Sequence, residues 1–166
     1  MLKKILKRIF QILLLAFIII QFIRPAKNKA EGISQNDISK IYPVPENVQT
    51  ILKTSCYDCH SNNTVYPWYA KIQPVAWWLN NHIQDGKKDL NFSEFASYRI
   101  RRQYKKLEEI NELVKKGEMP LDSYLWLHKN AKLDDQQKLT LANWVTTIRD
   151  TIKANYPADS LNRKKQ

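Results

Sequence analysis

The chain has 166 residues, of which 43% are hydrophobic and 11% aromatic, and only three of them are glycines. This composition excludes a disordered chain, and the scarcity of glycine favours helices over a β-rich fold, which needs many turns. The formal net charge is +11, but the excess lies at the two ends. Residues 31–162 are nearly neutral, with 17 basic and 16 acidic side chains, which argues against a nucleic-acid partner.

The amino terminus has a basic start and an apolar run, the plan of a signal sequence. Residues 1–8 read M-L-K-K-I-L-K-R, residues 9–23 contain no charged side chain, and no small-residue cleavage site follows. As a helix, residues 9–23 rise roughly 22 Å, so Lys7 and Arg8 are expected to snorkel if the helix is to span a hydrocarbon core of roughly 30 Å. The pattern therefore predicts an uncleaved anchor, one transmembrane helix within residues 1–26, which binds the chain to a membrane.

After a polar linker (residues 27–43), the periodic apolar pattern of residues 44–156 predicts an all-α domain of four or so helices around an aromatic core. No strand of any length is visible, and residues 157–166 form a basic tail. A long loop is predicted from Glu118 to Leu133. Helices are predicted from Glu46 to about Ser55, from Pro74 to a terminating Gly86, from Ser93 to Lys116 with Gly117 closing it, and from Asp134, where Gln137 completes a capping box.

Both cysteines lie in S-C-Y-D-C-H-S, residues 55–61, and three sites use such a pair. A structural zinc site needs four ligands, and the remaining histidines, His82 and His128, are too far apart in sequence to complete one. A dithiol redox pair follows a strand in a βαβ unit, a pattern that this chain lacks. The third site, C-x-x-C-H, attaches a c-type haem. The sequence therefore predicts one covalent haem c on Cys56 and Cys59, with His60 as proximal iron ligand.

A haem that transfers electrons usually has a second axial ligand, commonly Met or His. Apart from Met1, the one methionine is Met119, in a polar loop before a proline, and it is the predicted distal ligand. His82 and His128 are the rivals. Apolar cover of a haem tunes its potential by excluding water. The aromatic candidates for this pocket are Tyr66, Trp68, Tyr69, Trp77, Trp78, Tyr124 and Trp126, and the first choices among them are Tyr66, Trp68, Trp78 and Trp126.

With these motifs, the chain resembles the bacterial haem-binding domain family of small, membrane-anchored monohaem proteins similar to class I cytochromes c. The resemblance covers roughly residues 44–150 and the anchor. It implies covalent haem on Cys56 and Cys59, with His60 proximal and Met119 at the distal position. The segments that carry it are S-C-Y-D-C-H-S-N-N-T, Y-P-W-Y-A-K-I-Q-P-V-A-W-W-L, L-N-F-S-E-F and G-E-M-P-L.

Haem is attached covalently outside the bacterial cytoplasmic membrane, so the anchor predicts a single-pass protein whose haem domain lies on the periplasmic side. The predicted function is the transfer of single electrons between extracytoplasmic redox proteins, an electron carrier and not an enzyme. Two alternatives stay open. A peroxidase-like haem enzyme would use His82 or His128 as its acid or base, and a haem-based redox or gas sensor would need a signalling domain.

Overall fold

The fold consists of helices. The computed structural model describes residues 1–162, and this range contains no strand, which confirms the all-α class. Residues 163–166, the basic end of the predicted tail, lie outside the described residues. The α-helices are α1 (Leu2–Ile20), α2 (Glu46–Ser55), α3 (Tyr57–His60), α4 (Val75–Asp89), α5 (Ile100–Lys116), α6 (Asp122–Leu125), α7 (Asp135–Asn155) and α8 (Ala158–Leu161). The 3-10 helices are η1 (Ile38–Lys40), η2 (Trp68–Lys71), η3 (Phe92–Ser97) and η4 (Lys129–Ala131).

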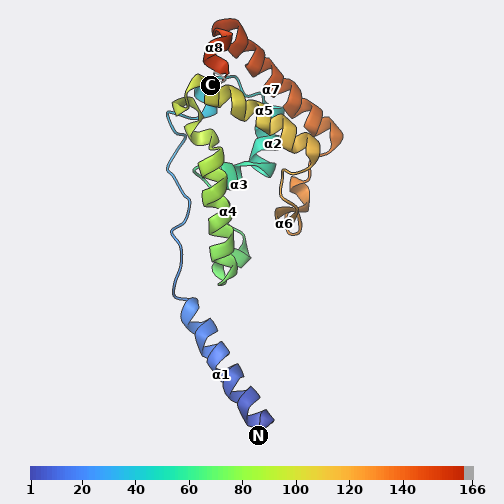
Figure 1. Cartoon of the computed structure of the whole chain (residues 1–166). Helices are drawn as coiled ribbons and strands as arrows, with labels where there is room; N and C mark the ends of the chain where they lie inside the picture. Colours follow the sequence, from blue (N-terminus) through green and yellow to red (C-terminus); the bar gives the residue numbers. More distant parts are fainter. Residues whose placement is uncertain (163–166) are drawn as a thin grey trace.

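The hydrophobic core lies where α5 and α7 pack along each other and against α2 (Figure 1). The apolar stripe predicted for the last helix is buried, and α5 contributes a second row. Each buried aliphatic side chain stabilises the fold by about 1.5–3 kcal/mol, so these helices form a firm base for the segments attached to them. The buried side chains of α7 and α5 include Leu141, Val145, Ile148, Ile152, Leu107, Ile110 and Val114.

Helix ends follow the sequence patterns at most positions. Gly117 ends α5 in the left-handed conformation, with φ 73°. Asp134 and Gln137 form the predicted capping box at the start of α7. The helix predicted from Ser93 instead begins at Ile100, because residues 92–97 form η3, which is capped by Asn91.

The prediction that Gly86 ends the second helix is wrong. α4 continues through Gly86 to Asp89, and the chain there packs directly against α3. A Cβ atom on Gly86 would lie 2.8 Å from the carbonyl oxygen of Cys59, which is closer than side chains approach backbone oxygens. The glycine is therefore required by the close approach of two helices, and not by a turn.

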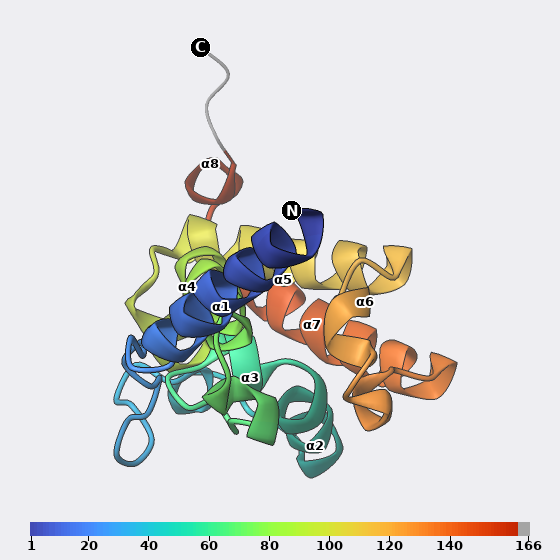
Figure 2. The same cartoon turned by 90° about the horizontal axis from the view of Figure 1, so that it is seen from below.

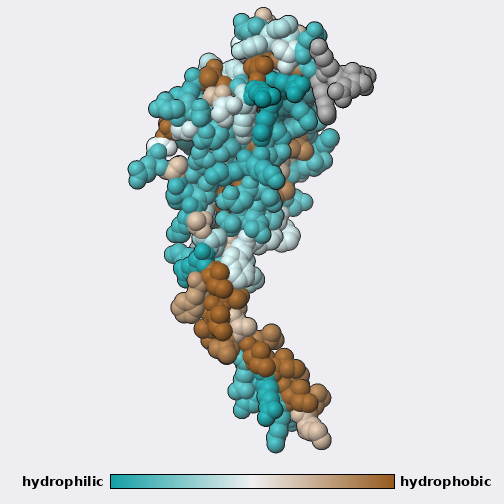
Figure 3. Space-filling model, turned by 60° about the vertical axis from the view of Figure 1, so that its left-hand side comes forward, coloured by the Kyte–Doolittle hydropathy of each residue, from teal (hydrophilic) through white to brown (hydrophobic). Residues whose placement is uncertain are grey.

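The prediction of a transmembrane helix is also wrong. The predicted single-pass location, with the domain on the periplasmic side, depended on that helix and is wrong as well. Within residues 1–162, no helix is both long enough and apolar enough to cross a membrane. α1 has 19 residues, but basic side chains occupy its first two turns and it ends at Ile20, before the uncharged run does. Its uncharged part, residues 9–20, rises about 18 Å, far less than the roughly 30 Å of a hydrocarbon core. α1 extends away from the hydrophilic domain with its apolar side chains exposed (Figure 3).

The segment after α1, residues 21–30, is bound to the domain, and we call it the strap. It runs beside α4 (Figure 1). The side chain of Gln21 pairs with the backbone N–H and carbonyl of Gln73, and the carbonyl of Ile23 accepts hydrogen bonds from Gln73 and from the indole of Trp77. Asn28 is buried. Its side chain contacts the Ser61 carbonyl, the Thr64 hydroxyl and the Lys87 ammonium group, at 2.9, 2.9 and 2.6 Å.

Candidate functional site

The C-Y-D-C-H sequence forms one helical turn directly after α2. The backbone N–H groups of Cys59 and His60 both donate to the carbonyl of Cys56, at 3.2 and 2.9 Å. Residues three and four apart share one face of a helix, so Cys56, Cys59 and His60 face the same side. Seen from below, this turn lies between α4 and α6 (Figure 2).

The turn opens onto a pocket of about 260 Å³, whose other walls are α4 and the segment from Met119 to Tyr124. A smaller, mostly apolar pocket of about 60 Å³ adjoins it and shares Cys56, His60 and Met119. Together the two pockets form a cleft with the motif on one side and Met119 on another. The apolar part of the cleft is lined by Leu90, Phe92, Ile110, Leu113, Val114 and Leu133.

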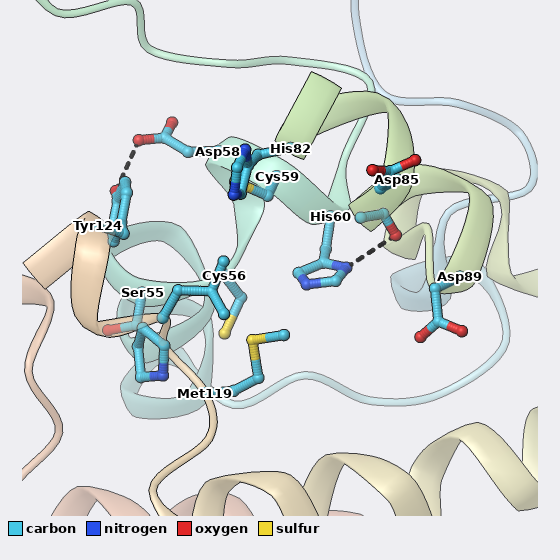
Figure 4. A pocket seen from close by; sticks show the side chains of 13 residues that line it. Ser55, Cys56, Asp58, Cys59, His60, His82, Asp85, Asp89, Met119 and Tyr124 are labelled. Carbon is cyan, nitrogen blue, oxygen red and sulfur yellow. Dashed lines mark hydrogen bonds between the residues drawn. The ribbon is translucent and has the colours of Figure 1, made fainter. Parts of the chain in front are cut away.

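His60 is held by two backbone carbonyls. Its Nδ1 lies 3.0 Å from the oxygen of Gly86 and 3.0 Å from the oxygen of Leu90. Because both partners are acceptors, Nδ1 must carry the proton, and in the neutral ring Nε2 keeps its lone pair. Figure 4 shows the imidazole projecting into the cleft. A histidine whose second nitrogen donates to a carbonyl is the usual arrangement of a metal ligand, since this bond fixes both tautomer and orientation.

The two cysteines are free and partly buried. Their surroundings favour the neutral thiol over the thiolate. Burial, reinforced by the neighbouring Cys59, raises the pKa of Cys56 to about 12. Burial, reinforced by Asp58, raises the pKa of Cys59 to about 11. Dithiol redox catalysts work in the opposite way, because they lower a thiol pKa to produce a reactive thiolate. The pocket therefore disfavours a dithiol redox site.

Met119 follows the end of α5 and lines both pockets. Its backbone nitrogen donates to the Leu113 carbonyl at 3.3 Å, as the Glu118 nitrogen does at 2.9 Å. In Figure 4 the thioether of Met119 and the imidazole of His60 point into the same space. The structure thus brings together four residues that the sequence placed in one site: Cys56, Cys59, His60 and Met119.

The rival histidines have other contacts. His82 lines the larger pocket, but its ring packs on Trp78 with centroids 4.3 Å apart, and its Nδ1 lies 2.9 Å from the Trp78 carbonyl. His128 stacks on the ring of Tyr124 at 4.0 Å and is not among the residues that line the two pockets. Across residues 1–162, no three His, Cys, Asp or Glu side chains cluster as metal ligands, which disfavours a zinc site.

Of the seven aromatic candidates, six do not line the cleft, the four first choices among them. Tyr66 accepts a hydrogen bond from the backbone of the strap, and Trp78 packs on His82. Trp68 and Trp126 are 72% and 71% exposed. Their place is taken by Tyr124, the seventh candidate, which lines the larger pocket. The aliphatic residues of the smaller pocket were not selected by sequence reasoning.

Sequence reasoning also missed the charges around the pocket. Three carboxylates line it, from Asp58, Asp85 and Asp89. Asp89 pairs with Lys106 at 2.6 Å, and Asp58 accepts a hydrogen bond from Tyr124 at 2.8 Å. The sequence could have predicted Asp85 and Asp89. Together with His82 they recur at helical spacing, which places them on the face of α4 that carries Gly86.

Comparison with known proteins gives one match. A family model described as a haem-binding domain matches residues 15–147, a range that contains every residue of the cleft. No curated protein matches the chain, and no solved structure does. The likeness to class I cytochromes c therefore stays a prediction.

Proposed function

Since the chain belongs to the haem-binding domain family, we propose that its haem is a single, covalently attached haem c and that the protein passes single electrons between redox-protein partners. The observation that supports this most strongly is the geometry of the motif. One helical turn presents two thiols and a histidine to a cleft that a methionine enters from another segment.

The residues fit the group in number and in kind. Each thiol S–H of Cys56 and Cys59 can add across one vinyl double bond, which forms a C–S and a C–H bond and needs no oxidant. The free Nε2 of His60 and the sulfur of Met119 would be the protein atoms that hold the iron, the donor pair of a His/Met haem protein. When bound, the haem supplies an iron that takes up and releases one electron.

The other residues of the cleft would influence the reduction potential of that iron. The aliphatic side chains of the smaller pocket exclude water from one part of the cleft. The carboxylates of Asp58, Asp85 and Asp89 favour the more positive ferric state, so we expect them to lower the reduction potential. If His60 and Met119 both held the iron, a substrate would have to displace Met119 to reach it, which favours an electron carrier over a haem enzyme or a gas sensor.

The test uses the purified full chain. We expect haem that survives acid–acetone extraction, and we expect the Cys56→Ala/Cys59→Ala variant to lose it. The ferric protein should be low-spin by EPR, with a weak far-red sulfur-to-iron band. Extractable haem in the wild type ends the c-type assignment, and a high-spin ferric spectrum ends the assignment of Met119 and favours the enzyme or sensor.

A further inference from the structure

The loop that presents Met119 is fixed firmly at its start. Gly117 turns the chain at the end of α5, and the next two nitrogens bond to the carbonyl of Leu113. These bonds tie Met119 to α5. They do not tie it to the cysteine turn, which α4 and α2 hold.

Among the described residues, one side-chain hydrogen bond joins the far part of the loop to the cysteine turn. Tyr124, in α6, donates its hydroxyl proton to Asp58 at 2.8 Å, and Asp58 stands between the two cysteines in the motif. The other oxygen of Asp58 accepts from the backbone nitrogen of Val65 at 2.8 Å. The carboxylate is therefore also held by a backbone partner other than Tyr124.

The Tyr124 ring is itself held in place. It stacks on His128 at 4.0 Å with an angle of 10° between the rings, and the edge of Tyr69 packs on His128 from another side. Nδ1 of His128 lies 3.1 Å from the carbonyl of Tyr124. Burial raises the pKa of Tyr124, and the Asp58 carboxylate raises it further, so the hydroxyl keeps its proton and stays a donor.

We propose that the hydrogen bond from Tyr124 to Asp58 is a latch that holds the Met119 loop against the cysteine turn. Tyr124 is then a positioning residue for the methionine ligand. This inference rests on the proposed function, because it requires that Met119 binds the iron. A latch of this kind controls how easily another ligand displaces Met119, since displacement requires the loop to move away from the turn.

Tyr124→Phe tests the latch, because it removes only the hydroxyl and keeps the ring that stacks on His128. We expect added imidazole to bind the ferric protein about tenfold more tightly in this variant, the factor for one lost hydrogen bond to a charged group. The far-red sulfur band should weaken as well. Tyr69→Phe is the matched control: it also removes a hydroxyl from a tyrosine that contacts His128, but it leaves Asp58 untouched, so the dissociation constant for imidazole should not change.

The two possible failures differ. If the wild-type protein lacks the far-red band, Met119 is not the ligand, and both the assignment and the latch are overturned. If the wild type shows the band but Tyr124→Phe binds imidazole as the wild type does, the latch alone is overturned. A urea midpoint measured for each variant separates a local release of the loop, with the midpoint nearly unchanged, from general unfolding, which would also overturn the latch.

Discussion

His60 is held by two backbone carbonyls at the end of a long helix, whereas Met119 lies in a loop that a side-chain hydrogen bond joins to the cysteine turn. On the His60 side, two carbonyls near the end of α4 orient the ring, and Gly86 lets α3 and α4 touch. On the Met119 side, the loop leaves α5, hydrogen-bonds to Asp58 of the motif through Tyr124 and packs on α2 through η4. Of the two proposed ligands, we therefore expect His60 to be the more rigidly held and Met119 to be the one that can be exchanged.

The contrast between the two sides is tested most strongly by replacing one glycine with alanine on each side, Gly86 on the His60 side and Gly117 on the Met119 side. Gly86→Ala should lower the free energy of unfolding of the full chain by about 3 kcal/mol, the upper end of the usual cost of overpacking, because its Cβ meets the backbone oxygen of Cys59 at 2.8 Å. Urea unfolding measures this cost.

The control lies on the Met119 side. Gly117→Ala puts a Cβ into open space, but the residue has φ 73°, so the expected cost is about 1 kcal/mol. We expect this variant to weaken the far-red band clearly, while the free energy of unfolding falls only by this small amount. Equal losses of stability in the two variants would show that the close approach at Gly86 is not a special constraint.

A second prediction sharpens the account of the cysteine turn. Burial raises the pKa of Cys56 to about 12 and that of Cys59 to about 11, from an ordinary value of 9.0. Near pH 8 the haem-free chain should therefore react with iodoacetamide at least roughly a hundredfold more slowly than the urea-unfolded chain, because only the thiolate reacts. Cys59 should react before Cys56.

The same shifts predict a pH dependence. The folded state favours the neutral thiol, so its contribution to stability is complete below pH 9 and is lost as the pH rises through about 11 to 12. The Cys56→Ala/Cys59→Ala variant is the control and should lose less stability over this range. Similar alkylation rates in the folded and unfolded chains would contradict the burial of the thiols.

Local patterns predicted the parts of the site that are contiguous in sequence. The spacing of C-x-x-C-H places three side chains on one helical turn, and Gly117 and Asp134 act at helix ends through their immediate neighbours. Contacts between distant segments could not be read in this way. Gly86 looks like a helix terminator until α3 is known to pack against it, and the exposed Trp68 looks like core material until its surroundings are known.

At the amino terminus, too, contacts with distant segments decide where the helix ends and how the next residues are held. The uncharged run extends to residue 23, but the helix stops at Ile20, and Gln21 bonds to Gln73 in place of continuing the helix. Residues 21–26 of the strap were predicted as the end of the anchor, and residues 27–30 as the start of a linker, because their sequence shows no periodicity. What fixes Asn28 is a set of partners 33 to 59 residues away, and no local pattern reports them.

A further prediction concerns this strap, and its cost is smaller than that of Gly86→Ala. Asn28 joins the two segments that flank His60: its amide donates to Ser61 and Thr64, just after the motif, and accepts from Lys87, next to Gly86 in α4. Asn28→Ala removes all three contacts from a buried site, so the free energy of unfolding should fall by about 2 kcal/mol.

Asn63→Ala is the matched control, since Asn63 also binds the strap, through the backbone of Ala30 at 3.0 Å, but at an exposed position where water can replace it. Its expected cost is below about 0.5 kcal/mol. If the strap supports the His60 side alone, Asn28→Ala should leave the imidazole affinity of the ferric protein unchanged while the urea midpoint falls. A change in imidazole affinity as large as that of Tyr124→Phe would mean that the two sides of the cleft are coupled through Asn28, and the contrast between a fixed histidine and an exchangeable methionine would have to be abandoned.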